Sequence, residues 1–333
     1  MHDVALLAGV SQKTVSRVLL NEQHVVEDKR RSVEQAIETL GYRRNDSARA
    51  LRPGQRTMTI GLIVGDIGNP WFSIVASTVE HLVAEHGYLL VTGSTSDDPL
   101  RERNVVLRLA ERRVDGLLIF PTAGDQAYLL PELDVGLEVV FLDRPPTNLV
   151  VDSVVPDHRA AARRAVLHLV SSGHRRIGYI GAGQDVGFSA AERLLGYADA
   201  LVSADLPYDA ALVRLGALDP DTAASHVQQL IALDHPPTAL FTANNRTTIG
   251  ALTALGGGLG GLALVGFDDF ELAGLLPIPI TVVAHDPAEL ARRGVAKLLD
   301  RIGGSERPAQ QEILPVHLIE RGSGEVRAPD DDA

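Results

Sequence analysis

From residue 57 to residue 325 the sequence repeats one pattern, a short apolar run followed by a longer stretch whose apolar residues recur at helical spacing. We interpret the apolar runs as strands at 58–65, 88–92, 115–120, 137–142, 149–152, 176–180, 238–242, 262–267 and 280–284. We interpret the intervening stretches as helices at 72–86, 99–113, 158–172, 190–203, 221–233, 246–255 and 287–302. Such alternation builds parallel sheets with helices on both faces. Because these strands are too many for one comfortable sheet, the sequence predicts an α/β body of two doubly wound subdomains, with ligand bound at the carboxyl ends of the strands.

The first forty residues have a different pattern, which indicates a small all-α head of three short helices. We expect Gly9 and Gly41 to end the first and third helices, since glycine adopts the left-handed conformation without steric cost. Ser11 is placed to cap the second helix through its hydroxyl. The residues that we expect to face inward are Val4, Ala5, Ala8, Val15, Val18, Val33, Ile37 and Leu40. A helix, a tight glycine turn, a capped helix and a supporting helix form a helix-turn-helix pattern.

The charge of the chain is divided unequally between its two ends. The 333 residues carry a net charge of −12, yet residues 1–56 hold ten Lys and Arg against seven Asp and Glu. Within residues 43–56 there are five arginines and a single acid, Asp46. This density of positive charge is suited to neutralising phosphates. The sequence therefore predicts a polyanionic partner that binds only the amino-terminal end of an otherwise acidic protein.

Several classes of protein are excluded by what the sequence lacks. It has no cysteine, which rules out disulfides, thiolate zinc sites and iron–sulfur clusters. It has no P-loop, HExxH or GxSxG motif, and the glycines at 181, 183 and 187 do not match the dinucleotide fingerprint. It has neither an uncharged apolar run long enough to cross a bilayer nor an export signal. We therefore expect a cytoplasmic protein that is not an enzyme and needs no cofactor, metal or membrane.

At residues 8–19 the segment AGVSQKTVSRVL resembles the DNA-binding head of the lactose/galactose repressor (LacI/GalR) family of bacterial transcription regulators. Further matches follow in order along the chain: IGLIVGDIGNPWF (60–72), ERRVDGLLIFP (111–121), LDRP (142–145), SGHRRIGYIG (172–181), AERLLGY (191–197), ALFTANN (239–245) and LVGFDDFELA (264–273). The resemblance implies a homodimer, or a tetramer, whose heads bind a pseudo-palindromic operator. It also implies that a periplasmic-binding-protein-like body binds a small effector.

The resemblance suggests boundaries for the parts of the chain. The DNA-binding head is expected at 1–42, and a hinge with a short hinge helix at 43–57. The body is expected at 58–325, and a disordered polar tail at 326–333. Within the body, the N-subdomain is expected to comprise 58–156 and 286–308, and the C-subdomain 157–285 and 309–325.

The second helix of a helix-turn-helix lies in the major groove, where its early residues reach base edges. Glutamine pairs with adenine and lysine or arginine with guanine, while hydroxyls suit phosphates. The candidates from this helix are Ser11, Gln12, Lys13, Thr14, Ser16 and Arg17. The resemblance implies further DNA contacts from Asn21, His24, Tyr42, Asn45, Ala48, Arg49, Leu51 and Arg52. The alternative is a three-helix packing domain whose polar face is merely solvated.

Residues 46–51 form at most two helical turns, which are unstable alone in water. The resemblance implies that this hinge helix forms on DNA and that Leu51 wedges into the minor groove, with Arg49 and Arg52 beside it. The alternative is that Leu51 packs against the body.

The chain departs from the family pattern at four places. Arg44 replaces a usual proline, Val26 replaces a hydroxyl cap, and Leu20 replaces a phosphate-contacting asparagine, for which Asn21 is a substitute. Family members also carry a few more residues before the position of Asp3, which raises an upstream start site as an alternative to Met1.

The resemblance also implies the residues of an effector site. Clefts of this kind hold a polar ligand through planar donors, carboxylates and an aromatic platform, and Asp and Arg together grip neighbouring hydroxyls. The matching positions are Asn69, Trp71, Phe72, Phe120, Asp143, Arg144, Arg193, Asn244, Asp268 and His285. Phe120 and His285 stand where sugar binders more often have amides, so a pentose, a hexose, a polyol and a nucleoside all stay open. Taken singly, such an aspartate can be a helix cap and Arg193 a surface ion pair.

We therefore predict a sequence-specific DNA-binding regulator, a repressor, whose operator affinity is controlled allosterically by a small polar effector, a sugar or a related polyol or nucleoside. A solute-binding protein without a DNA role is the alternative. It would need an export signal and no basic head.

Overall fold

The structure, a computed structural model, describes residues 1–19, 24–42, 56–183 and 187–329. The chain divides into two compact units, Met1–Thr57 and Met58–Ala333. None of the helices in the described ranges combines the length and apolarity that a membrane span requires.

The amino-terminal unit contains three helices, α1 (His2–Leu7), α2 (Gln12–Leu19) and α3 (Glu27–Leu40). Their shared core consists of Val4, Ala5, Val15, Val18, Val33 and Ala36. Gly9 has φ +63°, and the Ser11 hydroxyl accepts from the backbone N–H of Thr14 at 3.2 Å. The predicted helix, glycine turn and capped second helix are confirmed.

Helix α3 begins and ends as its sequence predicts. Val26 stands at its N-cap and makes no side-chain capping bond, while Gly41 closes it at φ +56°. One predicted core residue is wrong: Leu40 is 46% exposed, and Ala36 takes the inward place beside Val33. Position 40 shares the helix face of position 33, but it is the last residue of α3, where the helix ends.

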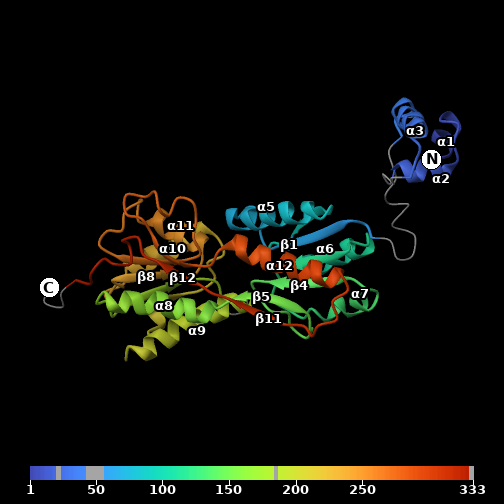
Figure 1. Ribbon diagram of the computed structural model, residues 1–333. Coiled ribbons are helices and arrows are strands. Elements are labelled where there is room, and N and C mark those ends of the chain that lie inside the picture. The colour runs from blue at the N-terminus through green and yellow to red at the C-terminus, as the bar shows by residue number, and fades with distance from the viewer. Residues whose placement is uncertain (20–23, 43–55, 184–186, 330–333) are drawn as a thin grey trace. The chain divides into compact units, whose positions relative to one another are not determined.

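The body contains two six-stranded sheets. The first has the order β11-β5-β4-β3-β1-β2 and is parallel throughout. Its strands are β1 (Thr59–Val64), β2 (Leu89–Ser94), β3 (Gly116–Ile119), β4 (Glu138–Leu142), β5 (Asp152–Pro156) and β11 (Gln311–Leu314). Its helices are α5 (Pro70–Glu85), α6 (Pro99–Glu111), α7 (Leu130–Asp134) after the 3₁₀ turn η1 (Ala127–Leu129), and α12 (Pro287–Ile302). Figure 1 shows α5 and α12 side by side on one face; α6 and α7 cover the other.

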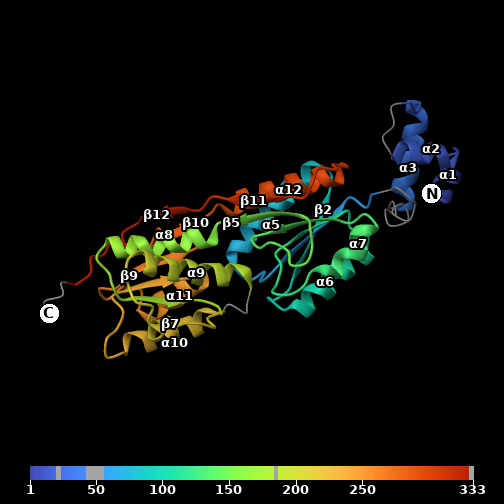
Figure 2. The same ribbon diagram turned by 90° about the horizontal axis from the view of Figure 1, so that it is seen from below.

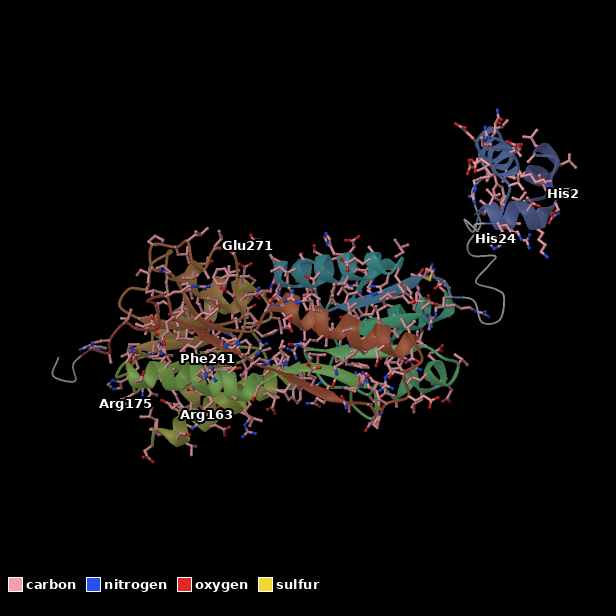
Figure 3. All side chains as sticks on the ribbon, viewed as in Figure 1. His2, His24, Arg163, Arg175, Phe241 and Glu271 are labelled. Carbon is pink, nitrogen blue, oxygen red and sulfur yellow. The ribbon has the colours of Figure 1, made fainter. Side chains whose placement is uncertain are left out.

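The second sheet has the order β12-β10-β9-β8-β6-β7, with only β12 antiparallel. Its strands are β6 (Ile177–Ile180), β7 (Val213–Arg214), β8 (Ala239–Thr242), β9 (Ala263–Phe267), β10 (Thr281–Ala284) and β12 (His317–Ile319). Its helices are α8 (His158–Ser171), α9 (Phe188–Ser203), α10 (Pro220–Ile231) and α11 (Asn245–Ala254), with the 3₁₀ turn η3 (Ala210–Leu212) before β7. Helices α8 and α9 pack on one face and α10 and α11 on the other. Phe241, labelled in Figure 3, is fully buried on the face that α8 and α9 cover. Two doubly wound sheets were predicted, and this fold class is confirmed.

The chain passes between the two subdomains three times, after β5, after β10 and after β11. The last passage corrects a predicted boundary. Residues 309–325 were assigned to the C-subdomain, but β11 pairs with β5 in the first sheet, as Figure 2 shows, and only β12 joins the second. The stretch QEIL has no apolar run to predict its partner. Its pairing with β5 is accompanied by burial of Leu314 in the core and by ion pairs from Glu312 to Lys297, at 2.9 Å, and to Arg293, both on α12.

The predicted disordered tail also needs correction at its beginning. The Val326 carbonyl lies 2.8 Å from Nε2 of the buried His174, and the Ala328 N–H donates to the Ser172 carbonyl at 3.1 Å. These bonds hold the segment against the end of α8. Residues 330–333 lie outside the described residues.

A buried carboxylate joins the start of β5 to the end of α12. Asp152, at the start of β5, has a fully buried side chain. It accepts from Arg301 Nε at 2.8 Å, from both terminal nitrogens of Arg307 at 2.8 and 2.9 Å, and from the Gln310 N–H at 2.8 Å. Burial alone would raise the pKa of Asp152, but the bonds from Arg301 and Arg307 outweigh it and lower the pKa to about 2.

We predict that Asp152→Asn lowers the free energy of unfolding by about 2–3 kcal/mol at neutral pH, because two guanidiniums lose their shared anion. The folded-state pKa is depressed, so this stabilisation is complete above the ordinary pKa near 4 and is lost as the pH falls toward 2. The difference from wild type in urea unfolding, followed by circular dichroism, should shrink over that interval. Asp134→Asn, at the exposed end of α7, is the matched control. Equal stability of wild type and Asp152→Asn would contradict the assigned role.

Candidate functional site

A cavity of about 400 Å³ lies where the carboxyl ends of both sheets meet. The loops after β1, β2 and β4 line it from the first subdomain, and the loops after β6, β8 and β9, with the start of α9, line it from the second. Its lining residues are Asp66, Asn69, Trp71, Phe72, Ser96, Asp97, Asp143, Arg144, Ala182, Ser189, Ala190, Arg193, Leu218, Ala243, Asn244, Asn245, Arg246 and Asp268. The cavity occupies the position that the alternating pattern predicts for a ligand.

Eight of the ten predicted effector residues line this cavity: Asn69, Trp71, Phe72, Asp143, Arg144, Arg193, Asn244 and Asp268. Phe120 and His285 do not. They are 4% exposed and pack behind the tryptophan, with ring centroids 5.7 Å and 5.6 Å from that of Trp71. Phe120 and His285 therefore support the aromatic wall that Trp71 and Phe72 form on the cavity.

The aromatic wall is positioned by the start of α5. The Asn69 side chain caps this helix by accepting from the Trp71 N–H at 3.1 Å, and Pro70 occupies its first turn. Trp71 is 8% exposed and meets Phe72 edge to face at 5.1 Å. This wall offers an apolar ring surface to the cavity.

His285 is a neutral part of this aromatic cluster. Burial lowers its pKa to about 3, although the nearby Asp143 opposes the shift. Neither ring nitrogen has a hydrogen-bond partner among the described residues. The residue follows β10, on one of the three passages between the subdomains.

Two aspartates hold corresponding places in the two sheets. Asp143 follows β4 and Asp268 follows β9, and both have left-handed backbones, with φ +68° and +64°. Asp143 lies 3.3 Å from His158 Nε2 and 3.4 Å from Arg144 Nε. Burial would raise the pKa of Asp143, but His158 and Arg144 outweigh it and hold the pKa well below its usual range.

Asp268 has the opposite electrostatic character. Burial raises its pKa and the nearby Asp143 adds to the shift, while Arg193 opposes it. Arg193 Nη1 lies 3.6 Å from Asp268 Oδ2 and donates to the Ala243 carbonyl at 2.6 Å. The guanidinium carbon stands 3.8 Å from the centroid of the Phe267 ring. The result is a fixed guanidinium beside a carboxylate whose charged form is poorly stabilised.

Polar contacts join the two subdomains across the cavity. Asn69 and Asn245 exchange two side-chain hydrogen bonds, of 3.3 and 2.9 Å. Asp66 pairs with Arg246 at 3.2 Å, and Arg144 Nε donates to the Ser189 hydroxyl at 3.0 Å. We call the Asn69–Asn245 and Asp66–Arg246 pairs the clasp. The cleft is closed by contacts of the protein itself.

Sequence reasoning missed several polar residues of the cavity: Asp66, Ser96, Asp97, Ser189, Asn245 and Arg246. A signal for them was present, because each lies within a few residues of the end of a predicted strand or at the start of a predicted helix. The partner of each residue across the cleft was not predictable from the sequence, since the contacts join residues as far as 180 positions apart.

We predict that Asn245→Ala opens the cleft more often, because it removes two hydrogen bonds that together contribute about 1–2 kcal/mol. Trp71 is the one tryptophan of the sequence, so its fluorescence reports on the cavity alone. Acrylamide should quench it more strongly in Asn245→Ala than in wild type. Asn104→Ala, on the exposed surface of α6, should leave the quenching unchanged. Identical quenching in all three proteins would contradict the role of the clasp.

The second candidate surface is on α2 in the amino-terminal unit. Gln12, Lys13 and Arg17 are exposed, and Thr14 and Ser16 are half-buried. Gln12 Nε2 lies 3.2 Å from Nδ1 of His2, which Figure 3 shows on the same unit. The Ser11 and Thr14 hydroxyls are 3.0 Å apart. The early residues of the helix therefore form a polar surface.

Two further predicted DNA contacts are described. His24 is exposed, and Tyr42 is half-buried against the core of the amino-terminal unit. The predicted contacts Asn21, Asn45, Ala48, Arg49, Leu51 and Arg52 lie outside the described residues, as do Leu20 and Arg44.

Comparison with known proteins finds a family match in each of the two units. Residues 1–45 match the model for bacterial regulatory proteins of the lacI family, and residues 166–324 match that for a periplasmic binding protein-like domain. The transcriptional repressor CytR of Escherichia coli K12 is 31% identical over 97% of this chain and 95% of its own length.

Two solved structures are similar over almost the whole chain. The lac repressor dimer bound to operator and the anti-inducer ONPF has a TM-score of 0.83 and 27% identity, and covers 97% of this chain and 98% of its own. The transcriptional regulator CelR in complex with cellobiose has a TM-score of 0.71 and 29% identity, over 96% and 98%.

A helix-turn-helix unit followed by a two-sheet body with a polar cavity defines a DNA-binding transcription regulator. Relatives that align from end to end are named as regulators and not as enzymes, in agreement with the sequence. This chain belongs to the lacI family of bacterial regulatory proteins.

Proposed function

We propose that this protein is a repressor that binds a pseudo-palindromic operator as a homodimer and responds to a small polar effector. The effector belongs to the sugars or to the related polyols and nucleosides. The observation that carries the proposal is the cavity at the strand ends, which combines an aromatic wall with an adjacent carboxylate and guanidinium. The cellobiose and anti-inducer complexes of similar proteins support an effector of this kind.

The chemistry of the cavity suits hydroxyl groups. Asp268 accepts and Arg193 donates, so one pair of neighbouring hydroxyls satisfies both side chains. The apolar face of a sugar ring or a base stacks on the Trp71 and Phe72 wall. Arg144 and Asn244 add donors at the rim of the same space.

The proposed mechanism is thermodynamic linkage between the cleft and the operator. An effector that prefers one arrangement of the two subdomains shifts the population toward it, and operator DNA prefers one arrangement of the paired heads. If effector binding changes operator affinity by some factor, operator binding changes effector affinity by the same factor. The clasp residues contribute to this equilibrium, because their bonds exist only in the closed cleft.

The first test concerns the DNA surface. Once the operator is selected from a pool of random duplexes with the wild-type chain, Lys13→Ala and Arg17→Ala should each weaken binding by about 5- to 150-fold, because each loses a base or phosphate contact. Lys29→Ala, on the exposed start of α3, should change binding less than about twofold. Full operator affinity in both α2 variants would reject this surface as the DNA contact.

The second test concerns the effector. Screening by thermal shift against sugars, polyols and nucleosides should find a compound that raises the melting temperature, since it binds only the folded body. The same compound should change operator affinity in wild type but not in Arg193→Ala, which lacks the donor beside Asp268. Arg163→Ala, whose side chain is exposed on α8 and labelled in Figure 3, is the matched control. If none of the stabilising compounds changes operator affinity, allosteric control is refuted.

A further inference from the structure

We propose that the cleft takes an uncharged polyhydroxy compound and rejects the same compound once it carries a phosphate or a carboxylate. This inference rests on the proposed effector role and narrows it, because sugars and nucleosides occur in cells both free and phosphorylated.

The first step is the charge of the lining. Four carboxylates face the cavity, from Asp66, Asp97, Asp143 and Asp268, against three guanidiniums, from Arg144, Arg193 and Arg246. The described lining contains no lysine and no histidine. A site for an anion generally carries an excess of positive charge. This lining has the opposite excess.

The second step is that each guanidinium is already engaged by protein groups. Arg144 contacts Asp97 at 3.5 Å, Asp143 at 3.4 Å and the Pro121 carbonyl at 3.0 Å. Arg246 Nη1 pairs with Asp66 across the cleft, while its buried Nε has no hydrogen-bond partner among the described residues. An incoming phosphate would compete with these carboxylates at short range, and the displaced carboxylates would remain in the cavity.

The third guanidinium, that of Arg193, is also engaged by protein groups. Arg193 donates to the Ala243 carbonyl, contacts Asp268 and lies over the Phe267 ring. Its Nε is buried and has no hydrogen-bond partner among the described residues. That single N–H suits one neutral acceptor, such as a hydroxyl oxygen, whereas phosphate recognition by arginine usually uses two parallel N–H groups.

The third step is the hydrogen bonding that Asp268 requires from a ligand. This residue is 9% exposed, and the partner recorded for its carboxylate in the described part of the chain is Arg193 at 3.6 Å. A hydroxyl donates a hydrogen bond to it, whereas a phosphate or carboxylate at neutral pH offers acceptors and a further negative charge. Burial and Asp143 already raise the pKa of Asp268, so a second anion beside it would be opposed further.

One feature of the cavity favours an anion, namely the start of helix α9. Helix α9 has Gly187 at its N-cap and no side-chain capping bond, and Ser189 and Ala190 in its first turn line the cavity. The positive end of a helix attracts negative charge. The Arg144 guanidinium lies against this end, since a Cβ added at Gly187 would stand 3.2 Å from its Nη1.

The test uses matched pairs of neutral and phosphorylated compounds with the full-length chain. Calorimetry and thermal shift compare D-ribose, D-glucose and adenosine with the corresponding monophosphate esters, and D-glucose with D-gluconate. We expect the neutral member of the binding pair to bind at least about a hundredfold more tightly than its charged partner. A phosphorylated or carboxylated member that binds as tightly or more tightly overturns the inference.

A variant pair tests the cause. Asp97→Asn removes one negative charge and releases Arg144 from one of its partners, so the ratio of neutral to phosphorylated affinity should fall about tenfold or more. Asp134→Asn makes the same change of charge on the exposed α7 and should keep the ratio within about twofold. An unchanged ratio in Asp97→Asn overturns the electrostatic explanation.

The outcomes separate this inference from the proposed function. If the charged member of a pair binds more tightly and also changes operator affinity, the effector role stands and the charge inference fails. If no member of any pair binds, and no compound of the wider screen alters operator binding, the effector role fails and the inference falls with it.

Discussion

The structure of the body depends on one constraint, that buried charges must be compensated where the ends of two parallel sheets face each other. Every parallel strand places its carboxyl end at the same edge, so the loops that follow bring many polar side chains into one small space. Asp143 meets this constraint through His158 and Arg144. Asp268 meets it only in part, through Arg193 at 3.6 Å. The unequal compensation of these two carboxylates is the basis of the ligand preference that we propose for the cavity.

Much of this arrangement could be predicted from the sequence, because it depends on local patterns. The alternation of apolar runs and helical stretches predicted the two sheets and a ligand cavity at the carboxyl ends of their strands, whereas the eight lining residues came from the family resemblance. Glycine and serine predicted the turns of the head. In each case the relevant physical property, side-chain periodicity or backbone conformation, belongs to a few neighbouring residues.

The features that could not be predicted depend on residues far apart in the sequence. Strand β11 has no apolar pattern and is held by its pairing with β5, by the buried Leu314 and by the ion pairs of Glu312 with α12. The family resemblance implied ligand contacts from Phe120 and His285, yet their packing against Trp71 places them behind the wall. The clasp pairs Asn69 with Asn245, which no local rule links. Long-range pairing of this kind is decided by the whole fold.

The three passages between the subdomains limit how the body can move. Each passage is only a few residues long, after β5, β10 and β11, and a peptide chain cannot stretch beyond about 3.8 Å per residue. Three short connections leave the subdomains few ways to move. A large sliding or separation of the subdomains would overextend at least one connection. A rotation or bend about the connections changes only backbone dihedral angles. A signal generated in the cavity therefore leaves the body mainly as a change in the angle between the two subdomains.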